Sequence, residues 1–189
     1  IFIIEHLELK LWKWCLIEYK SISSLVGKKN LWFTNIQDRK EALKLSKYGR
    51  VYQESVADLN LKKSCLLDMD AKQQLETKDN KKFKFLIFGG ILGDFPRKKR
   101  TKSKLIKRIK FKLGMRNLGN KQFSTDNAVF LAKEILEGEK LKNLKFKNKI
   151  EIKINDIESI ELPFCYPLVN NKPRISKELV NYLKNKKEF

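Results

Sequence analysis

The sequence predicts an α/β protein with a mainly parallel sheet, and two features of the chain carry this prediction. The first is the segment FKFLIFGGILGD at residues 83–94, in which an apolar run of strand length ends in two glycines. Runs rich in aromatic and β-branched residues are typical of strands buried on both faces of a parallel sheet. The second is an alternation of short apolar runs with helical patterns over residues 1–139. Because such sheets bind ligands at the carboxyl ends of their strands, we expect the functional site there.

Local patterns predict the individual elements of this part of the chain. Strands are expected at residues 1–7, 31–35, 64–70 and 83–88, and a strand or an extended loop is expected at residues 51–56. Helices are expected at residues 12–19, 38–48, 73–82 and 124–137, the second capped by Asp38 and the last by Ser124 or Thr125. In the first helix, the side chains predicted to face the core are Trp12, Cys15, Leu16 and Tyr19. Glu18, on the same helix, is expected either to be solvated or to take part in catalysis.

A change in composition at residues 140–149 marks the boundary that we draw in the chain. We expect residues 1–139 to form the α/β domain and residues 140–189 to form a C-terminal extension packed on it. The extension is predicted to contain strands at 150–154 and 159–162, a stiff two-proline loop with the sequence LPFCYP, and a terminal helix at 176–186.

The charge of the chain points to an anionic partner, most naturally RNA or an RNA–protein particle. The formal net charge is +20 and the pI is about 9.8. Only seven of the 42 basic residues are arginine, and a lysine surplus of this kind also fits an AT-rich genome or a hot environment. The distribution is more informative, because residues 97–116 hold eleven basic residues and no acidic one. The candidate RNA-binding residues in this tract are Arg97, Arg100, Lys104 and Arg108.

Several classes of site and location are disfavoured by the sequence. The three cysteines are far apart and lack a CxxC spacing, so neither a zinc site nor a disulfide framework is predicted, and a reducing cytoplasm is expected. No apolar run approaches the ~20 residues of a membrane span. His6 is the only histidine, which disfavours a Ser-His or Cys-His triad, so a carboxylate is the expected general base.

Two backbone features are candidate ligand sites. Glycines after a buried strand allow a ligand to approach the main chain, which applies to Gly89, Gly90 and Gly93. The helix opened by Ser124 and Thr125 presents free amides at its positive end. On the residues alone, an ordinary strand-to-helix turn and plain helix capping are the simpler explanations of these features. A dinucleotide-binding loop is less suitable, because a basic tract follows where its fingerprint needs an acidic residue.

Three stretches occur together in an order that resembles a known family: FGGILGDFPRKKRT, RNLGNKQFSTDNAV and IELPFCYP. They are similar to SPOUT-class S-adenosylmethionine-dependent methyltransferases. The branch is that of the enzyme that methylates an arginine of a small-subunit ribosomal protein, whose archaeal members are labelled RNA methyltransferases. The segment IEHLE near the start and the step LLD at residues 66–68 also fit, so the resemblance covers nearly the whole chain.

The resemblance implies a C-terminal trefoil knot within the α/β domain and S-adenosylmethionine bound among three loops. On this sequence the loops are residues 67–70, 88–94 and 113–126. The implied cofactor-binding residues are Leu67, Asp68, Phe88, Gly89, Gly90, Gly93, Leu118, Gly119, Gln122, Ser124 and Thr125.

The acceptor of the methyl group is expected to be an arginine of a ribosomal protein. A protonated guanidinium must be oriented and must lose a proton, which requires carboxylates. The candidates are Asp94, Glu18, Glu5 and Asp126, with a surface charge, a cap or a salt bridge as the plainer explanation for each. The alternatives are an RNA methyltransferase, whose acceptor pocket would be basic or aromatic, and a non-catalytic ribosome- or RNA-binding module without cofactor affinity. A cytoplasmic monomer that needs no metal is expected, its extension covering the surface through which other SPOUT enzymes dimerise.

Overall fold

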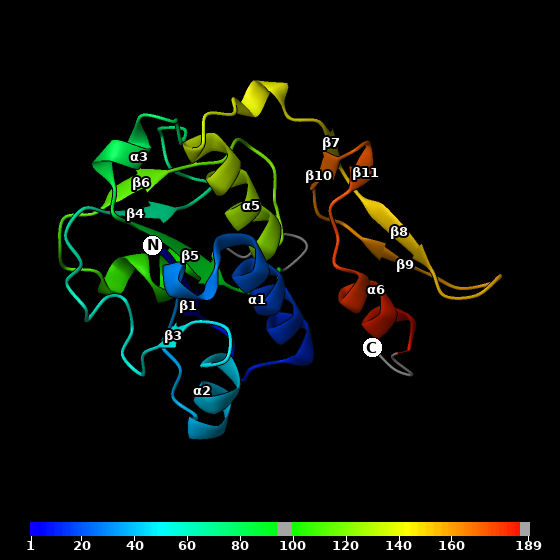
Figure 1. Cartoon of the computed structure of the whole chain (residues 1–189), viewed down its shortest axis with the longest axis horizontal. Helices are drawn as coiled ribbons and strands as arrows, with labels where there is room; N and C mark the ends of the chain where they lie inside the picture. The colour runs from blue at the N-terminus through cyan, green and yellow to red at the C-terminus, as the bar shows by residue number, and fades with distance from the viewer. Residues whose placement is uncertain (94–99, 186–189) are drawn as a thin grey trace.

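The computed structural model describes residues 1–93 and 100–185. Its centre is a six-stranded sheet of parallel neighbours with the strand order β3-β2-β1-β5-β4-β6 (Figure 1). The strands are β1 (Phe2–His6), β2 (Leu31–Thr34), β3 (Arg50–Val51), β4 (Ser64–Leu67), β5 (Phe85–Gly90) and β6 (Gly114–Arg116). The predicted α/β architecture with a mainly parallel sheet is therefore confirmed.

The central strand β5 is buried because its side chains alternate between two apolar clusters. Leu86 and Phe88 pack on the face covered by α1 (Lys13–Val26) and α5 (Thr125–Leu136). Ile87 points to the other face, where Leu105 closes the core after α4 (Arg100–Lys104). Burying one aliphatic side chain of this size stabilises a fold by about 1.5–3 kcal/mol. This packing fixes the carboxyl end of β5, from which the glycine loop starts.

Shorter elements complete this part of the chain. They are the helices α2 (Arg39–Leu45) and α3 (Asp79–Lys82) and the 3₁₀ turns η1 (Lys28–Asn30) and η2 (Ile106–Arg108). Asp38 caps α2 as predicted, since its side chain accepts a hydrogen bond of 2.8 Å from the amide of Glu41.

The rest of the chain forms small antiparallel sheets and one helix beside α1 and α5 (Figure 1). Its elements are η3 (Leu141–Asn143), β7 (Phe146–Lys147), β8 (Ile150–Lys153), β9 (Ser159–Leu162), β10 (Tyr166–Val169), β11 (Lys172–Pro173) and α6 (Lys177–Lys184). These elements have an apolar cluster of their own, which Ile17 of α1 joins. The strands expected at 150–154 and 159–162 and the terminal helix are present.

Three local predictions are wrong. The helix expected at 73–82 is reduced to α3, because residues 73–75 run alongside Asn117, which exchanges backbone hydrogen bonds with Gln73 and Leu75. Trp12 precedes α1 and is 43% exposed, so it does not belong to the core face. The two-proline loop ends at β10, which includes Pro167, because the chain pairs with β7 there.

In the described ranges, no helix combines the length and the apolar character that crossing a membrane requires.

Candidate active site

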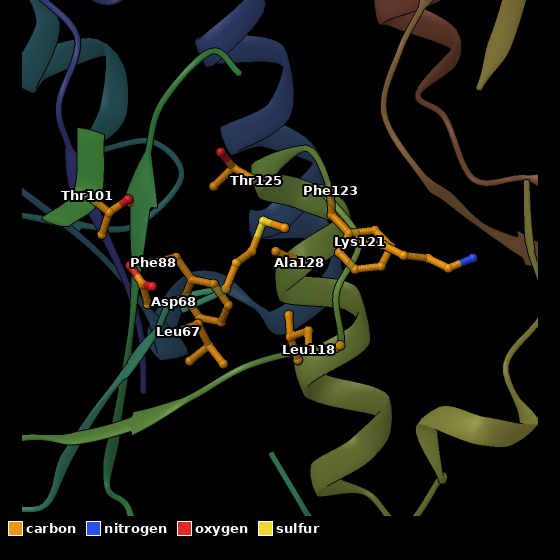
Figure 2. Close-up of a pocket in the computed structure, with 12 residues that line it drawn as sticks. Leu67, Asp68, Phe88, Thr101, Leu118, Lys121, Phe123, Thr125 and Ala128 are labelled. Atoms are coloured by element: carbon orange, nitrogen blue, oxygen red, sulfur yellow. The ribbon is translucent and has the colours of Figure 1, made fainter. Parts of the chain in front are cut away.

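A pocket lies at the carboxyl end of the sheet, where the three glycine-containing or polar loops meet. Side chains from the ends of β4 and β5 and from the segment before α5 converge around it (Figure 2). Its lining residues are Leu67, Asp68, Met69, Phe88, Gly89, Thr101, Leu118, Gly119, Lys121, Phe123, Thr125 and Ala128. The functional site was expected at this end of the sheet. Seven of the eleven suggested cofactor-binding residues line the pocket.

The glycines of the pocket are fixed by close packing and by backbone conformation. A Cβ on Gly89 would lie 2.9 Å from the hydroxyl oxygen of Thr101, so a side chain here would push Thr101 away from the pocket. Gly119 has φ +88°, a conformation that L side chains rarely adopt. Both positions let another molecule approach the main chain.

The other suggested cofactor residues lie beside the pocket. A Cβ on Gly90 would lie 2.3 Å from the Tyr19 hydroxyl, so Gly90 is needed for packing against α1. A Cβ on Gly93 would lie 2.6 Å from the ring of Phe164 and 3.1 Å from Nε2 of Gln122. The glycine loop, the segment before α5 and the C-terminal extension therefore meet at Gly93.

Two carboxylates, Glu18 of α1 and Asp126 of α5, are buried behind Thr125. The indole Nε1 of Trp14 donates to Glu18 at 2.8 Å, and the backbone amide and hydroxyl of Thr125 donate to it as well. The free amides predicted at the start of α5 thus receive a carboxylate from the protein itself. Solvation of Glu18, one of the two expectations for this residue, is wrong.

Asp126 is surrounded by donors. Ser124, at the N-cap of α5, makes no capping bond; its hydroxyl donates to Asp126 at 2.7 Å. The hydroxyl of Ser21 donates to the other carboxylate oxygen at 3.2 Å. The guanidinium of Arg174 donates to that same oxygen at 2.9 Å and to the amide oxygen of Asn127 at 2.8 Å.

The extension therefore completes this cluster. Arg174 follows β11 and is only partly exposed. Tyr166 begins β10, and burial together with the negative charges of Asp126 and Glu18 raises the pKa of its hydroxyl well above the usual range. The two acids are thus enclosed by residues from both ends of the sequence.

Burial, and next the negative charge of Asp126, raise the pKa of Glu18 from 4.5 to about 8, against the opposing effect of the hydrogen bonds from Trp14 and Thr125. A carboxylate with a pKa near 8 is ionised and able to accept a proton at slightly alkaline pH, as a general base must be. Paired carboxylates are also the natural receptor for a guanidinium, which carries five donors in a planar fork. The cluster can therefore orient a cationic acceptor and remove a proton from it.

The structure does not bring Glu5 into this cluster. Glu5 of β1 is fully buried against β2 and the segment after β3. The hydroxyls of Thr34 and Ser55 donate hydrogen bonds to its carboxylate at 2.5 Å, and the amide of Val56 donates one at 2.9 Å. This saturated carboxylate has a structural role. Asp94 lies outside the described residues.

The basic candidates that the structure describes each form a polar contact with another part of the protein. Arg100 donates to Glu8 at 2.9 Å and to the carbonyl of Leu92. Lys104 donates to the carbonyl of Leu7 at 3.1 Å. Arg108 forms an exposed ion pair of 3.3 Å with Asp58, and Arg97 lies outside the described residues. The described basic candidates of residues 97–116 thus connect this tract to Glu8, Leu92, Leu7 and Asp58.

Several residues of the site were not selected from the sequence. In the pocket these are Met69, Thr101, Lys121, Phe123 and Ala128, and around the acids they are Trp14, Ser21, Asn127, Tyr166 and Arg174. Arginine is scarce in this lysine-rich chain, with seven among 42 basic residues, and a guanidinium is the better partner for a buried carboxylate. That scarcity was a usable signal for Arg174.

No cluster of three or more potential metal-binding side chains occurs within residues 1–93 and 100–185. The three cysteines are reduced and buried. His6 lies under the glycine loop, with Nδ1 2.9 Å from the hydroxyl of Tyr19, and desolvation lowers its pKa.

The chain matches known proteins along almost its entire length. The family described as "Protein arginine N-methyltransferase SFM1-like" matches residues 1–188. Protein arginine N-methyltransferase SFM1 of Saccharomyces cerevisiae is 33% identical over 200 residues, covering 97% of this chain and 93% of the yeast protein. The yeast SFM1 structure complexed with SAH superimposes with a TM-score of 0.86 at 31% identity, covering 96% of this chain and 93% of the other. The complex with SAM gives the same TM-score and identity and covers 97% and 89%.

A more distant likeness concerns the fold alone. The Trm10 structure from Thermococcus kodakaraensis superimposes with a TM-score of 0.57 at 15% identity, covering 75% of this chain and 95% of the other. The α/β domain therefore has a structural neighbour of the SPOUT class.

Proposed function

Because the chain belongs to the SFM1-like family of protein arginine N-methyltransferases, we propose that it transfers the methyl group of S-adenosylmethionine to an arginine of a small-subunit ribosomal protein. The observation that carries this proposal is the buried Glu18–Asp126 pair directly behind the pocket wall. An acidic receptor suits a guanidinium, whereas a base or ribose of RNA calls for aromatic or basic surroundings. The family match likewise favours an enzyme over a binding module.

The residues of the pocket fit S-adenosylmethionine. Leu67, Phe88 and Leu118 offer apolar surface for the adenosine, and the backbone at Gly89 and Gly119 is open to close approach. The yeast relative has been solved in complex with SAM, SAH and MTA. When bound, the cofactor supplies a methyl group activated by attachment to a positively charged sulfur.

The acidic pair performs the remaining chemistry. Asp126, balanced by Arg174, orients the guanidinium of the acceptor. A guanidinium nitrogen forms a bond to the methyl carbon as the carbon–sulfur bond breaks, and the sulfur keeps that electron pair as a neutral thioether. Glu18 takes the proton that the nitrogen loses. Positioning of the nitrogen and the methyl carbon at about 3–3.5 Å is the main requirement of such a displacement.

Methyl transfer into small ribosomal subunits tests the proposal. Tritiated S-adenosylmethionine is supplied, and the protein and RNA fractions are then separated and counted. We expect label in a protein, recovered as methylarginine after hydrolysis. Glu18→Gln should lower the rate at least 100-fold, since a general base contributes ~10²–10⁴. Label in the RNA fraction alone would refute the assignment of the acceptor.

Two controls accompany this experiment. Glu137→Gln removes an exposed carboxylate at the end of α5 and should leave the rate unchanged. Calorimetry with S-adenosylmethionine should give the same affinity for the wild type and for Glu18→Gln. A loss of cofactor binding in that variant would place Glu18 in the cofactor site instead of the acceptor site.

The knot, the division at residue 139 and the monomeric state are part of the same proposal. The likeness to a SPOUT-class neighbour supports a trefoil knot. The separate apolar cluster of the extension supports a boundary near residue 140. The extension packs on α1 and α5 and supplies Arg174 to the site, which supports a monomer. Light scattering on the purified protein checks the last point.

A further inference from the structure

We propose that a lysine-lined groove at the amino end of the sheet binds single-stranded RNA. The methyl-transfer pocket lies where the strands of the sheet end, and the groove lies where they begin. It is formed at the starts of β4 and β6 and in the segment leading into β5. Its volume is about 590 Å³. It is lined by Asn60, Leu61, Lys62, Lys63, Ser64, Lys82, Phe83, Phe111, Lys112, Leu113 and Gly114. The proposal does not depend on the identity of the methyl acceptor.

The charge of the groove is of one sign. Lys62, Lys63, Lys82 and Lys112 are exposed around it, and the lining contains no carboxylate. Asp79 is buried beside Arg116, and its carboxylate accepts two hydrogen bonds of 2.8 Å from Arg116 and one of 3.1 Å from the amide of Glu76. Arg116 is the direct ion-pair partner of that acid, and of the groove lysines Lys82 interacts with it electrostatically. A concave surface with four exposed cations and no carboxylate in its lining attracts a polyanion.

The floor of the groove is apolar, aromatic and rigid. Phe83 is buried on the guanidinium of Arg116, which lies 5.1 Å from its ring centre. A Cβ on Gly114 would lie 2.4 Å from the same ring, so glycine is required for Phe83 to pack there. Phe111 is half-buried and leaves part of its ring open to the groove. Open aromatic rings between cations are the platform on which single-stranded nucleic acids stack their bases.

The rim is shaped by an unusual backbone. Asn60 and Lys63 have φ values of +45° and +58°, a region that residues other than glycine seldom occupy. The carbonyl of Lys63 accepts from the amides of Lys84 and Phe85 at 2.8 and 3.4 Å, which anchors this turn to β5. Lys63 is thus set at the mouth of the groove by the sheet itself.

These features favour RNA over an acidic protein segment. Carboxylates of a peptide would use the lysines but leave the aromatic and leucine surface without a partner, whereas a nucleotide chain has phosphates and flat bases for both. Stacking also favours a single strand, because the bases of a duplex are enclosed.

The test measures binding of a fluorescent 20-nucleotide single-stranded RNA of mixed sequence by anisotropy, at several salt concentrations. The groove variant carries Lys62→Gln, Lys63→Gln, Lys82→Gln and Lys112→Gln. The matched control carries Lys28→Gln, Lys29→Gln, Lys44→Gln and Lys47→Gln and loses the same charge. These four lysines are exposed and lie near η1 and α2, on the side of the sheet formed by β2 and β3. Circular dichroism confirms that both variants fold.

The groove variant should bind the RNA at least tenfold more weakly, with the control within threefold of the wild type. Each lost phosphate contact should lower the slope of log K against log salt by about 0.7. Phe111→Ala should weaken binding at least fivefold without changing the slope, since it removes stacking alone. Equal losses in the groove and control variants would overturn the proposal, as would equally tight binding of duplex RNA or of polyglutamate.

Discussion

The raised pKa of the buried acid Glu18 predicts that methyl transfer by this protein depends on pH in a defined way. With a pKa near 8, roughly one tenth of the Glu18 side chains are ionised at pH 7 and roughly nine tenths at pH 9. The guanidinium of the acceptor does not titrate in this range. We therefore expect kcat/KM to rise about tenfold between pH 7 and pH 9 and then to level off.

The same shift predicts a pH-dependent stability. Because the pKa of Glu18 is higher in the folded protein than its ordinary value of 4.5, the folded chain keeps a proton that the unfolded chain releases. The stabilising contribution is present below pH 4.5 and is lost as the pH rises toward about 8. Within this window the free energy of unfolding should fall by up to about 1.4 kcal/mol per pH unit on account of this group.

Both effects are measured on Glu18→Gln and its surface control Glu137→Gln. Initial rates with a peptide or subunit substrate give the kinetic profile, and urea unfolding at pH 5, 6 and 7 gives the stability. The residual activity of Glu18→Gln should not rise through pH 8, and its stability should not carry the wild-type slope. A wild-type rate that is flat from pH 7 to pH 9, or one that rises equally in Glu18→Gln, would refute the role of Glu18 as base.

Three other substitutions probe the surroundings of the site. Arg174→Gln should raise the pKa of Glu18 further, because it leaves the charge of Asp126 unbalanced. The pH profile of kcat/KM should therefore move to higher pH, with unchanged cofactor affinity. Arg174→Lys should restore much of the wild-type profile. Arg116→Met should cost about 3–5 kcal/mol in urea unfolding, because Asp79, whose side chain is 1% exposed, loses its partner. A double variant with Asp79→Leu should recover part of that loss, and failure to do so would contradict the ion-pair explanation. Gly90→Ala should destabilise the protein by about 1–3 kcal/mol through contact with Tyr19, and by less in a Tyr19→Phe background, where the hydroxyl is absent. Equal costs in both backgrounds would argue against that contact.

The sheet could be predicted because its strands are local apolar runs. β1, β2, β4 and β5 lie within the ranges expected, apart from the two glycines that extend β5. The helix expected at 73–82 failed because pairing with Asn117, more than 40 positions further along, determines the conformation of residues 73–75. No pattern inside that segment reports such a contact.

The candidate site could be predicted in part for the same reason. The three loops meet because the carboxyl ends of parallel strands share one edge. The acidic cluster needs contacts between remote parts of the chain: Ser21 lies 105 positions from Asp126 and 153 from Arg174, and bonds to both. Glu18 and Asp126 were among the candidates, but their proximity and the enclosure by Tyr166 depend on tertiary packing.

The contribution of the extension to the acidic cluster relates activity to the order of protein synthesis. A nascent chain that has reached β6 and α5 already contains every described residue of the pocket among the loops. Tyr166 and Arg174 follow about 30 to 40 residues after the end of α5 and emerge from the translating ribosome after it. Until then Asp126 lacks its guanidinium partner and the acids stay open to water, which screens their charges. The protein would first meet its cofactor and only afterwards become able to modify a target.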